Sequence, residues 1–165
     1  MLPFFMTLLE TFDQAFGTVS FRTRAILDLT SEENLYRRPR ELPNTFAMFT
    51  TGEYILRSAA AVEQTFGGIT TRLWDDPFEW TLPEKLYSTE MIKEYLDEVD
   101  KTRADGIAFI ANDDSLSKSI PAPGKILPIS KVLIDTLGRS EHYLGRAYAV
   151  FQMISDEKLP RVESL

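Results

Sequence analysis

The sequence contains no cysteine in its 165 residues and only one histidine, His142. Without cysteine the chain cannot form a disulfide, a thiolate nucleophile or a Cys-ligated zinc or iron–sulfur centre. With one imidazole, any mechanism that needs two or three histidines from the same chain is also excluded. These two shortages leave carboxylates, hydroxyls, amides and cations as the side chains from which a site could be built.

Basic side chains and long apolar runs are also scarce. The chain has 18 Lys and Arg against 25 Asp and Glu, a net charge of −7. Because clustered positive charge is what holds a phosphate backbone, we expect no nucleic-acid partner. No run approaches the ~20 apolar residues of a membrane span, and Glu10 and Asp13 interrupt the apolar start before it could serve as a secretion signal. We expect no membrane partner and a cytoplasmic location.

Apolar side chains with helical spacing are abundant. They make up 44% of the chain, enough for one core, and we interpret residues 1–165 as a single domain. Four segments repeat apolar residues every three to four positions, which predicts four helices. These run from about Phe4 to Leu29, from after Pro43 (with Asn44 or Thr45 as cap) to Gly67-Gly68, from Ser88 to Ile110, and from Pro128 to Ile154. Similar lengths and one-sided stripes predict an all-α four-helix bundle.

The connection between the second and third helices, residues 67–87, is longer than bundles usually need. It contains Trp74 and Trp80, and a linker left in solvent would not need two tryptophans. We predict a crossover that packs along the bundle, so that the second and third helices run parallel. The same segment could instead line the mouth of a pocket or a dimer interface.

Three short stretches resemble, in their order and spacing, motifs of the DinB-like (DinB/YfiT) family of bacterial four-helix bundles. Residues 29–35 (LTSEENL) are similar to the acidic turn after helix one, residues 44–53 (NTFAMFTTGE) to the start of helix two, and residues 139–146 (RSEHYLGR) to the helix-four signature. The resemblance implies an up-down-down-up bundle, often a homodimer. In many members three histidines bind a divalent metal, and some relatives are thiol-dependent transferases or isomerases that activate a thiol on it.

The resemblance places the three metal ligands on Gly52, Arg139 and Tyr143 of this chain, with Glu53 beside the first. Glycine offers no side-chain donor, a guanidinium repels a metal ion, and neutral tyrosine is a poor ligand, so we predict no metal cofactor there. His142 matches the histidine beside the ligand pair. At ~100° per residue it points nearly opposite the apolar centre of its helix, which indicates a surface position.

Arg139 is the most informative of these positions, because an unpaired buried charge costs several kcal/mol. We predict that a carboxylate, Glu53 by analogy with the metal geometry, holds Arg139 in the bundle and that Tyr143 contributes its hydroxyl. The alternative is that the long arginine stem carries the guanidinium past the flank into water.

Three functions stay open. The first is a small-ligand-binding or structural module with a degenerate metal site, for an anionic or apolar ligand. The second is an enzyme of the thiol-transferase type with a site rebuilt from Glu53, Tyr143 and Arg139, and the third is a homodimeric interaction module. The carboxylates of the third helix allow an oxygen-ligand metal site, although a solvated helix face explains them more simply; they are Glu90, Glu94, Asp97, Glu98 and Asp100.

Overall fold

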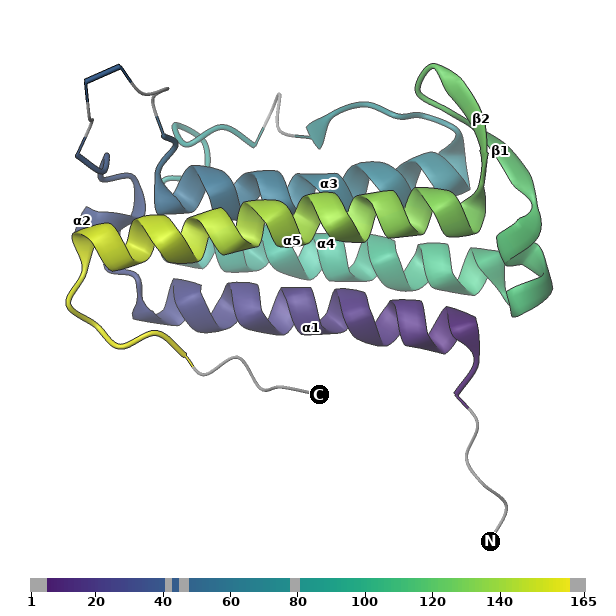
Figure 1. Ribbon diagram of the computed structural model, residues 1–165, viewed down its shortest axis with the longest axis horizontal. Helices are drawn as coiled ribbons and strands as arrows, with labels where there is room; N and C mark the ends of the chain where they lie inside the picture. Colours follow the sequence, from purple (N-terminus) through teal and green to yellow (C-terminus); the bar gives the residue numbers. More distant parts are fainter. Residues whose placement is uncertain (1–5, 41–42, 45–47, 78–80, 161–165) are drawn as a thin grey trace, which may run out of the picture.

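Four long helices form where the apolar spacing predicts them (Figure 1). The computed structural model describes residues 6–40, 43–44, 48–77 and 81–160. The long helices are α1 (Leu8–Leu29), α3 (Thr51–Thr71), α4 (Thr89–Ile110) and α5 (Ile129–Ile154); α2 (Glu32–Leu35), the 3-10 turn η2 (Asp113–Ser117) and a hairpin of β1 (Ser119–Ala122) and β2 (Lys125–Pro128) complete the described elements. The all-α bundle is confirmed, and among the described residues the strands are limited to this hairpin of two four-residue segments.

Side-chain caps mark where α1, α3 and α4 begin. Thr50 forms a capping box with Glu53, so α3 starts at Thr51 and the predicted cap Asn44 is wrong. Asn44 instead lies in a turn with φ of 65°, a left-handed conformation that asparagine tolerates. The other predicted positions, Phe4 and Thr45, lie outside the described residues.

The second predicted helix also ends later than expected. It continues through Gly67-Gly68 to Thr71 and stops at Arg72, which adopts the left-handed conformation. The glycine pair does not end the helix. Gly68 instead serves packing, since a Cβ there would lie 2.4 Å from the ring of Trp74. Glycine at this position allows the indole to lie directly on the helix backbone.

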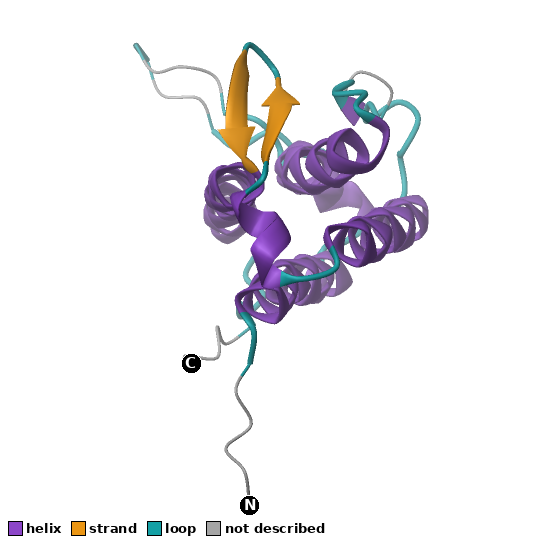
Figure 2. Ribbon diagram, turned by 90° about the vertical axis from the view of Figure 1, so that its right-hand side faces the viewer, coloured by secondary structure: helices purple, strands orange, loops and turns teal. Residues whose placement is uncertain are grey.

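The four helices run up-down-down-up, as predicted. Figure 1 shows α1 and α5 running in one direction and α3 and α4 in the other. The contacts agree: Ser58 of α3 bonds to Ser140 of α5, and Thr65, further along α3, bonds to Thr136, which lies earlier in α5. Contact partners that move backwards along one helix as the other advances show that α3 and α5 are antiparallel. The end-on view of Figure 2 shows the helices around one centre, with the hairpin projecting beside them.

The crossover prediction is confirmed for the described part of residues 72–88, which return from the end of α3 to the start of α4 (Figure 1). Thr81 is buried, and Leu86 packs against the core and accepts a hydrogen bond from the Tyr36 hydroxyl through its carbonyl. At the far end, Glu32 accepts from the backbone N–H of Thr89 at 2.9 Å. Trp80 lies outside the described residues.

One hydrophobic core holds side chains of all four long helices. Its largest members include Phe16, Phe66 and Phe151, and each contributes roughly 1.5–3 kcal/mol by leaving water. Phe16 and Phe66 meet edge to face at 5.2 Å between ring centroids. No helix among the described residues is long and apolar enough to cross a membrane.

Candidate functional site

The position of the family's helix-two histidine is filled by a neighbouring ring. A Cβ on Gly52 would lie 2.5 Å from Cε1 of Tyr36 and 2.9 Å from the carbonyl oxygen of Leu35. Burial raises the pKa of Tyr36, and the carboxylates of Glu53 and Glu32 raise it further, so its phenol stays protonated and donates to the crossover. Residue 52 therefore has no room for a metal-binding side chain while Tyr36 stays in place.

Glu53 does not reach Arg139, so the predicted ion pair is wrong. The Glu53 carboxylate accepts from the N–H and the hydroxyl of Thr50 at 2.8 and 2.9 Å. The Arg139 side chain is exposed, and its Nη2 donates to Gln64 Oε1 at 3.2 Å and weakly to the Ala61 carbonyl at 3.5 Å. Arg139 thus lies opposite Ala61, two helical turns or about 12 Å beyond Glu53 at ~1.5 Å per residue.

Tyr143 belongs to a separate aromatic contact. Its ring stacks on Tyr54 with centroids 6.4 Å apart, and Arg146 lies near the same Tyr54, with its Nη1 3.4 Å from the hydroxyl. His142 is exposed, and its ring lies 5.7 Å from that of Tyr143. The four predicted positions therefore contact four different neighbours.

The fit of a family-type metal can be tested on these contacts. Gly52 has no donor and no space, Arg139 faces Gln64, and Tyr143 is stacked on Tyr54. Within the described part of the chain, no group of three or more His, Asp or Glu side chains is arranged to hold an ion. The residues at the family position do not fit the metal.

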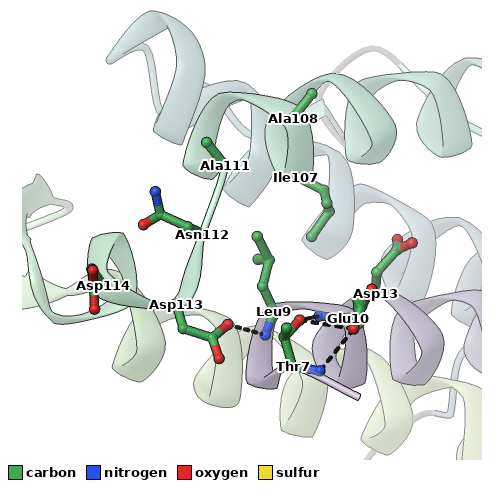
Figure 3. Close-up of a pocket in the computed structure, with 10 residues that line it drawn as sticks. All are labelled: Thr7, Leu9, Glu10, Asp13, Ile107, Ala108, Ala111, Asn112, Asp113 and Asp114. Atoms are coloured by element: carbon green, nitrogen blue, oxygen red, sulfur yellow. Dashed lines mark hydrogen bonds between the residues drawn. The ribbon is translucent and has the colours of Figure 1, made fainter. Parts of the chain in front are cut away.

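A large hollow lies at the end of the bundle, between the start of α1 and the end of α4 (Figure 3). Its volume is about 710 Å³, and four carboxylates line it: Glu10, Asp13, Asp113 and Asp114. Asp113 accepts from the backbone N–H groups of Leu8 and Leu9 at 2.9 and 2.8 Å. Glu10 closes the capping box with Thr7, and Asp13 lies 3.5 Å from Arg103.

These contacts explain why the end of the bundle is acidic. Carboxylates at a helix N-terminus satisfy free N–H groups and are stabilised by the helix dipole by about 0.3–1 kcal/mol each. Three of the four carboxylates already have a structural partner. The hollow therefore reads as the capped end of α1 rather than as a ligand site.

A second groove, of about 230 Å³, lies between the C-terminal half of α3, the first half of α5, the hairpin and the start of the crossover. Its walls combine one aromatic ring, several aliphatic side chains, a pair of hydroxyls and two cations. The residues that line it are Gln64, Thr65, Trp74, Ala122, Pro123, Lys125, Leu127, Val132, Asp135, Thr136 and Arg139. Arg139 is the one of the four predicted site positions that lines this groove, and Trp74 of the crossover also lines it.

Gln64 joins the aromatic side of this groove to its charged side. Its Nε2 donates to the carbonyl of Trp74 at 3.0 Å, and its Oε1 accepts from Arg139 at 3.2 Å. Trp74 is held from the other direction by contact with Gly68. The amide therefore fixes the backbone that carries the indole and, at the same time, one nitrogen of the guanidinium.

The two cations of the groove keep donors available. Among the described residues, the Arg139 side chain uses only Nη2 for hydrogen bonds, and the Lys125 ammonium makes no hydrogen bond or ion pair. Asp135, the one carboxylate of the groove, is paired with Lys131. The buried hydroxyls of Thr65 and Thr136 bond to each other at 2.6 Å. The groove is thus suited chemically to a small anion with an apolar body.

The sequence interpretation missed Gln64 and Lys125. Gln64 follows Ala61 by three residues on α3 and so shares a face with it, but nothing in the sequence indicated that this face meets Arg139. Lys125 is placed by the turn at Gly124, whose φ of 73° suits glycine. Only the fold of the hairpin against α5 brings that lysine to the groove.

Comparisons with known proteins agree with the architecture. No protein-family model and no curated protein matches the sequence. The structure resembles the crystal structure of a DinB-like protein from Bacillus cereus ATCC 10987 with a TM-score of 0.73 and 18% sequence identity, covering 93% of this chain and 97% of that one. At that identity the likeness concerns the fold. The chain therefore has the four-helix fold of a DinB-like protein.

Proposed function

We propose that this protein is a ligand-binding bundle that works without the family metal and takes a small anion in the groove between α3, α5 and the hairpin. One observation carries the proposal: Arg139 lines this groove with two of its nitrogens free of hydrogen bonds to described residues. A guanidinium offers a planar fork of donors that matches a carboxylate. Such charge-assisted hydrogen bonds are about twice as strong as neutral ones.

A titration with small carboxylates tests the proposal. Calorimetry or NMR should detect binding of acetate or benzoate to the wild-type chain, and Arg139→Gln should weaken it at least tenfold. Arg146→Gln is the matched control, since it removes the same charge two turns along the same helix and outside the groove lining. Equal binding by wild type and Arg139→Gln, or no binding of any carboxylate, would overturn the proposal.

The alternative enzyme of the thiol-transferase type receives less support. Its rebuilt site requires Glu53, Tyr143 and Arg139 together, yet each contacts a different neighbour. Elemental analysis of the purified protein, followed by thermal shifts with zinc, nickel and low-molecular-weight thiols, separates the two functions. Stoichiometric metal that raises the melting temperature and activates a thiol would favour the enzyme.

A further inference from the structure

We propose, resting on the anion site above, that the groove selects a singly charged carboxylate attached to a flat ring, and that Gln64 is the residue that positions the ring-binding and anion-binding walls. The ring would lie along Trp74 and the carboxylate between Arg139 and Lys125. Three features of the groove lead to this class of ligand: a fixed indole, the balance of charges and the volume.

The indole wall is held in place before any ligand arrives. Trp74 lies so close to Gly68 that a Cβ there would meet its ring at 2.4 Å. The carbonyl of the same residue accepts from Gln64, so both the side chain and the backbone of Trp74 are tied to α3. A preordered aromatic wall favours a flat ring, because offset stacking adds to the burial of apolar area and little freedom is lost on binding.

The charges favour a single negative charge on the ligand. Arg139 and Lys125 offer donors to one carboxylate. Asp135 lines the same groove, and although Lys131 pairs with it, a second negative charge on the ligand would face that carboxylate. That repulsion disfavours phosphate-like dianions. The two cations repel ring-bearing amines, and an uncharged amide carries no negative charge for them to hold.

The volume limits the size of the ligand. The groove measures about 230 Å³, below the ~300–1,000 Å³ of sites that take drug-sized molecules. One ring or two fused rings with a short carboxylate arm would suit that space. The aliphatic side chains of Leu127 and Val132 would cover the edge of the ring, and the paired hydroxyls of Thr65 and Thr136 are already satisfied by each other.

Four probes of related shape test this class: benzoate, cyclohexanecarboxylate, acetate and benzamide, each titrated by NMR into the wild-type chain. We expect benzoate to bind about fivefold more tightly than cyclohexanecarboxylate and at least tenfold more tightly than acetate or benzamide. The indole N–H resonance that disappears in Trp74→Phe should shift with benzoate.

Three variants test the two walls. Trp74→Leu should remove the preference for benzoate over cyclohexanecarboxylate. Trp74→Phe retains a ring and should keep that preference, which gives a second reading of the same wall where the leucine variant does not fold. Gln64→Leu should weaken the binding of benzoate more than that of acetate, because the hydrogen bonds that link the Trp74 backbone and Arg139 through Gln64 are lost. The test therefore reads a change of selectivity, which simple loss of stability would not produce.

The failures are distinguishable. If benzoate, cyclohexanecarboxylate and acetate bind equally and all depend on Arg139, the anion site stands and the ring class is wrong. If the ring preference survives in Trp74→Leu, the position assigned to the ring is wrong. If no carboxylate binds, or binding ignores Arg139, the proposed function itself fails.

Discussion

Because the Tyr36 ring occupies the space beside Gly52, a larger residue at position 52 should destabilise the fold. Replacing Gly52 by Ala places a Cβ 2.5 Å from the Tyr36 ring and 2.9 Å from the Leu35 carbonyl, closer than side chains pack. The ring can turn, but the carbonyl belongs to the backbone at the end of α2 and must shift with it. Overpacking of this kind costs about 1–3 kcal/mol, which exceeds the gain of up to about 1 kcal/mol that alanine brings to a helix.

Gly67 is the matched control on the same helix, since nothing lies within 4 Å of the Cβ that it would gain. Gly67→Ala should therefore stabilise the fold by about 0.5–1 kcal/mol. Because the helix gain is common to both, the two alanine variants should differ by the overpacking cost of about 1–3 kcal/mol, or about 2–12 °C in melting temperature at ~2–4 °C per kcal/mol. Urea titration and thermal melts followed by circular dichroism measure both quantities.

Tyr36 supplies a further check through a double-mutant cycle. Gly52→Ala should cost less in a Tyr36→Ala background than in the wild type, because one of its two close contacts is gone. If Gly52→Ala is as stable as Gly67→Ala, the Tyr36 ring moves aside at no cost, and residue 52 does have room for a metal-binding side chain.

Two other predictions concern pH and assembly. Burial raises the pKa of Glu63, and the opposing hydrogen bond from Tyr95 at 2.6 Å does not cancel that rise. Between its unfolded and folded pKa values the folded chain therefore binds more protons than the unfolded chain. The free energy of unfolding falls as pH rises through the folded pKa. Glu63→Gln should therefore be more stable than wild type near pH 7, with a gain in urea midpoint that shrinks towards pH 4; a gain independent of pH would contradict this. We also propose a homodimer, because the apolar residues Phe21 on α1 and Ile134 on α5 are 69% and 56% exposed to solvent in the single chain. Sedimentation equilibrium should give twice the 18.8 kDa chain mass. A monomer at high micromolar concentration would exclude the dimer.

Much of the architecture could be predicted because it depends on local patterns. The spacing of apolar residues predicted four helices, and Ser88 predicted the start of α4 through its own side-chain bond to Met91. The long connection predicted that α3 and α4 run parallel. Each of these features depends on residues close together in the chain or on a length, and both are visible without the fold.

The candidate site depended on information that no local pattern carries. Periodicity shows which face of a helix is buried, but not how far one helix slides along another. That offset places Arg139 beside Gln64 and leaves Glu53, two turns away, to cap its own helix. The loss of the family's histidines was visible in the sequence. Only tertiary packing decided that Tyr36 fills the space at Gly52 and that Trp74, Gln64 and Lys125 surround Arg139, because those contacts join segments distant in the chain through the shapes of their side chains.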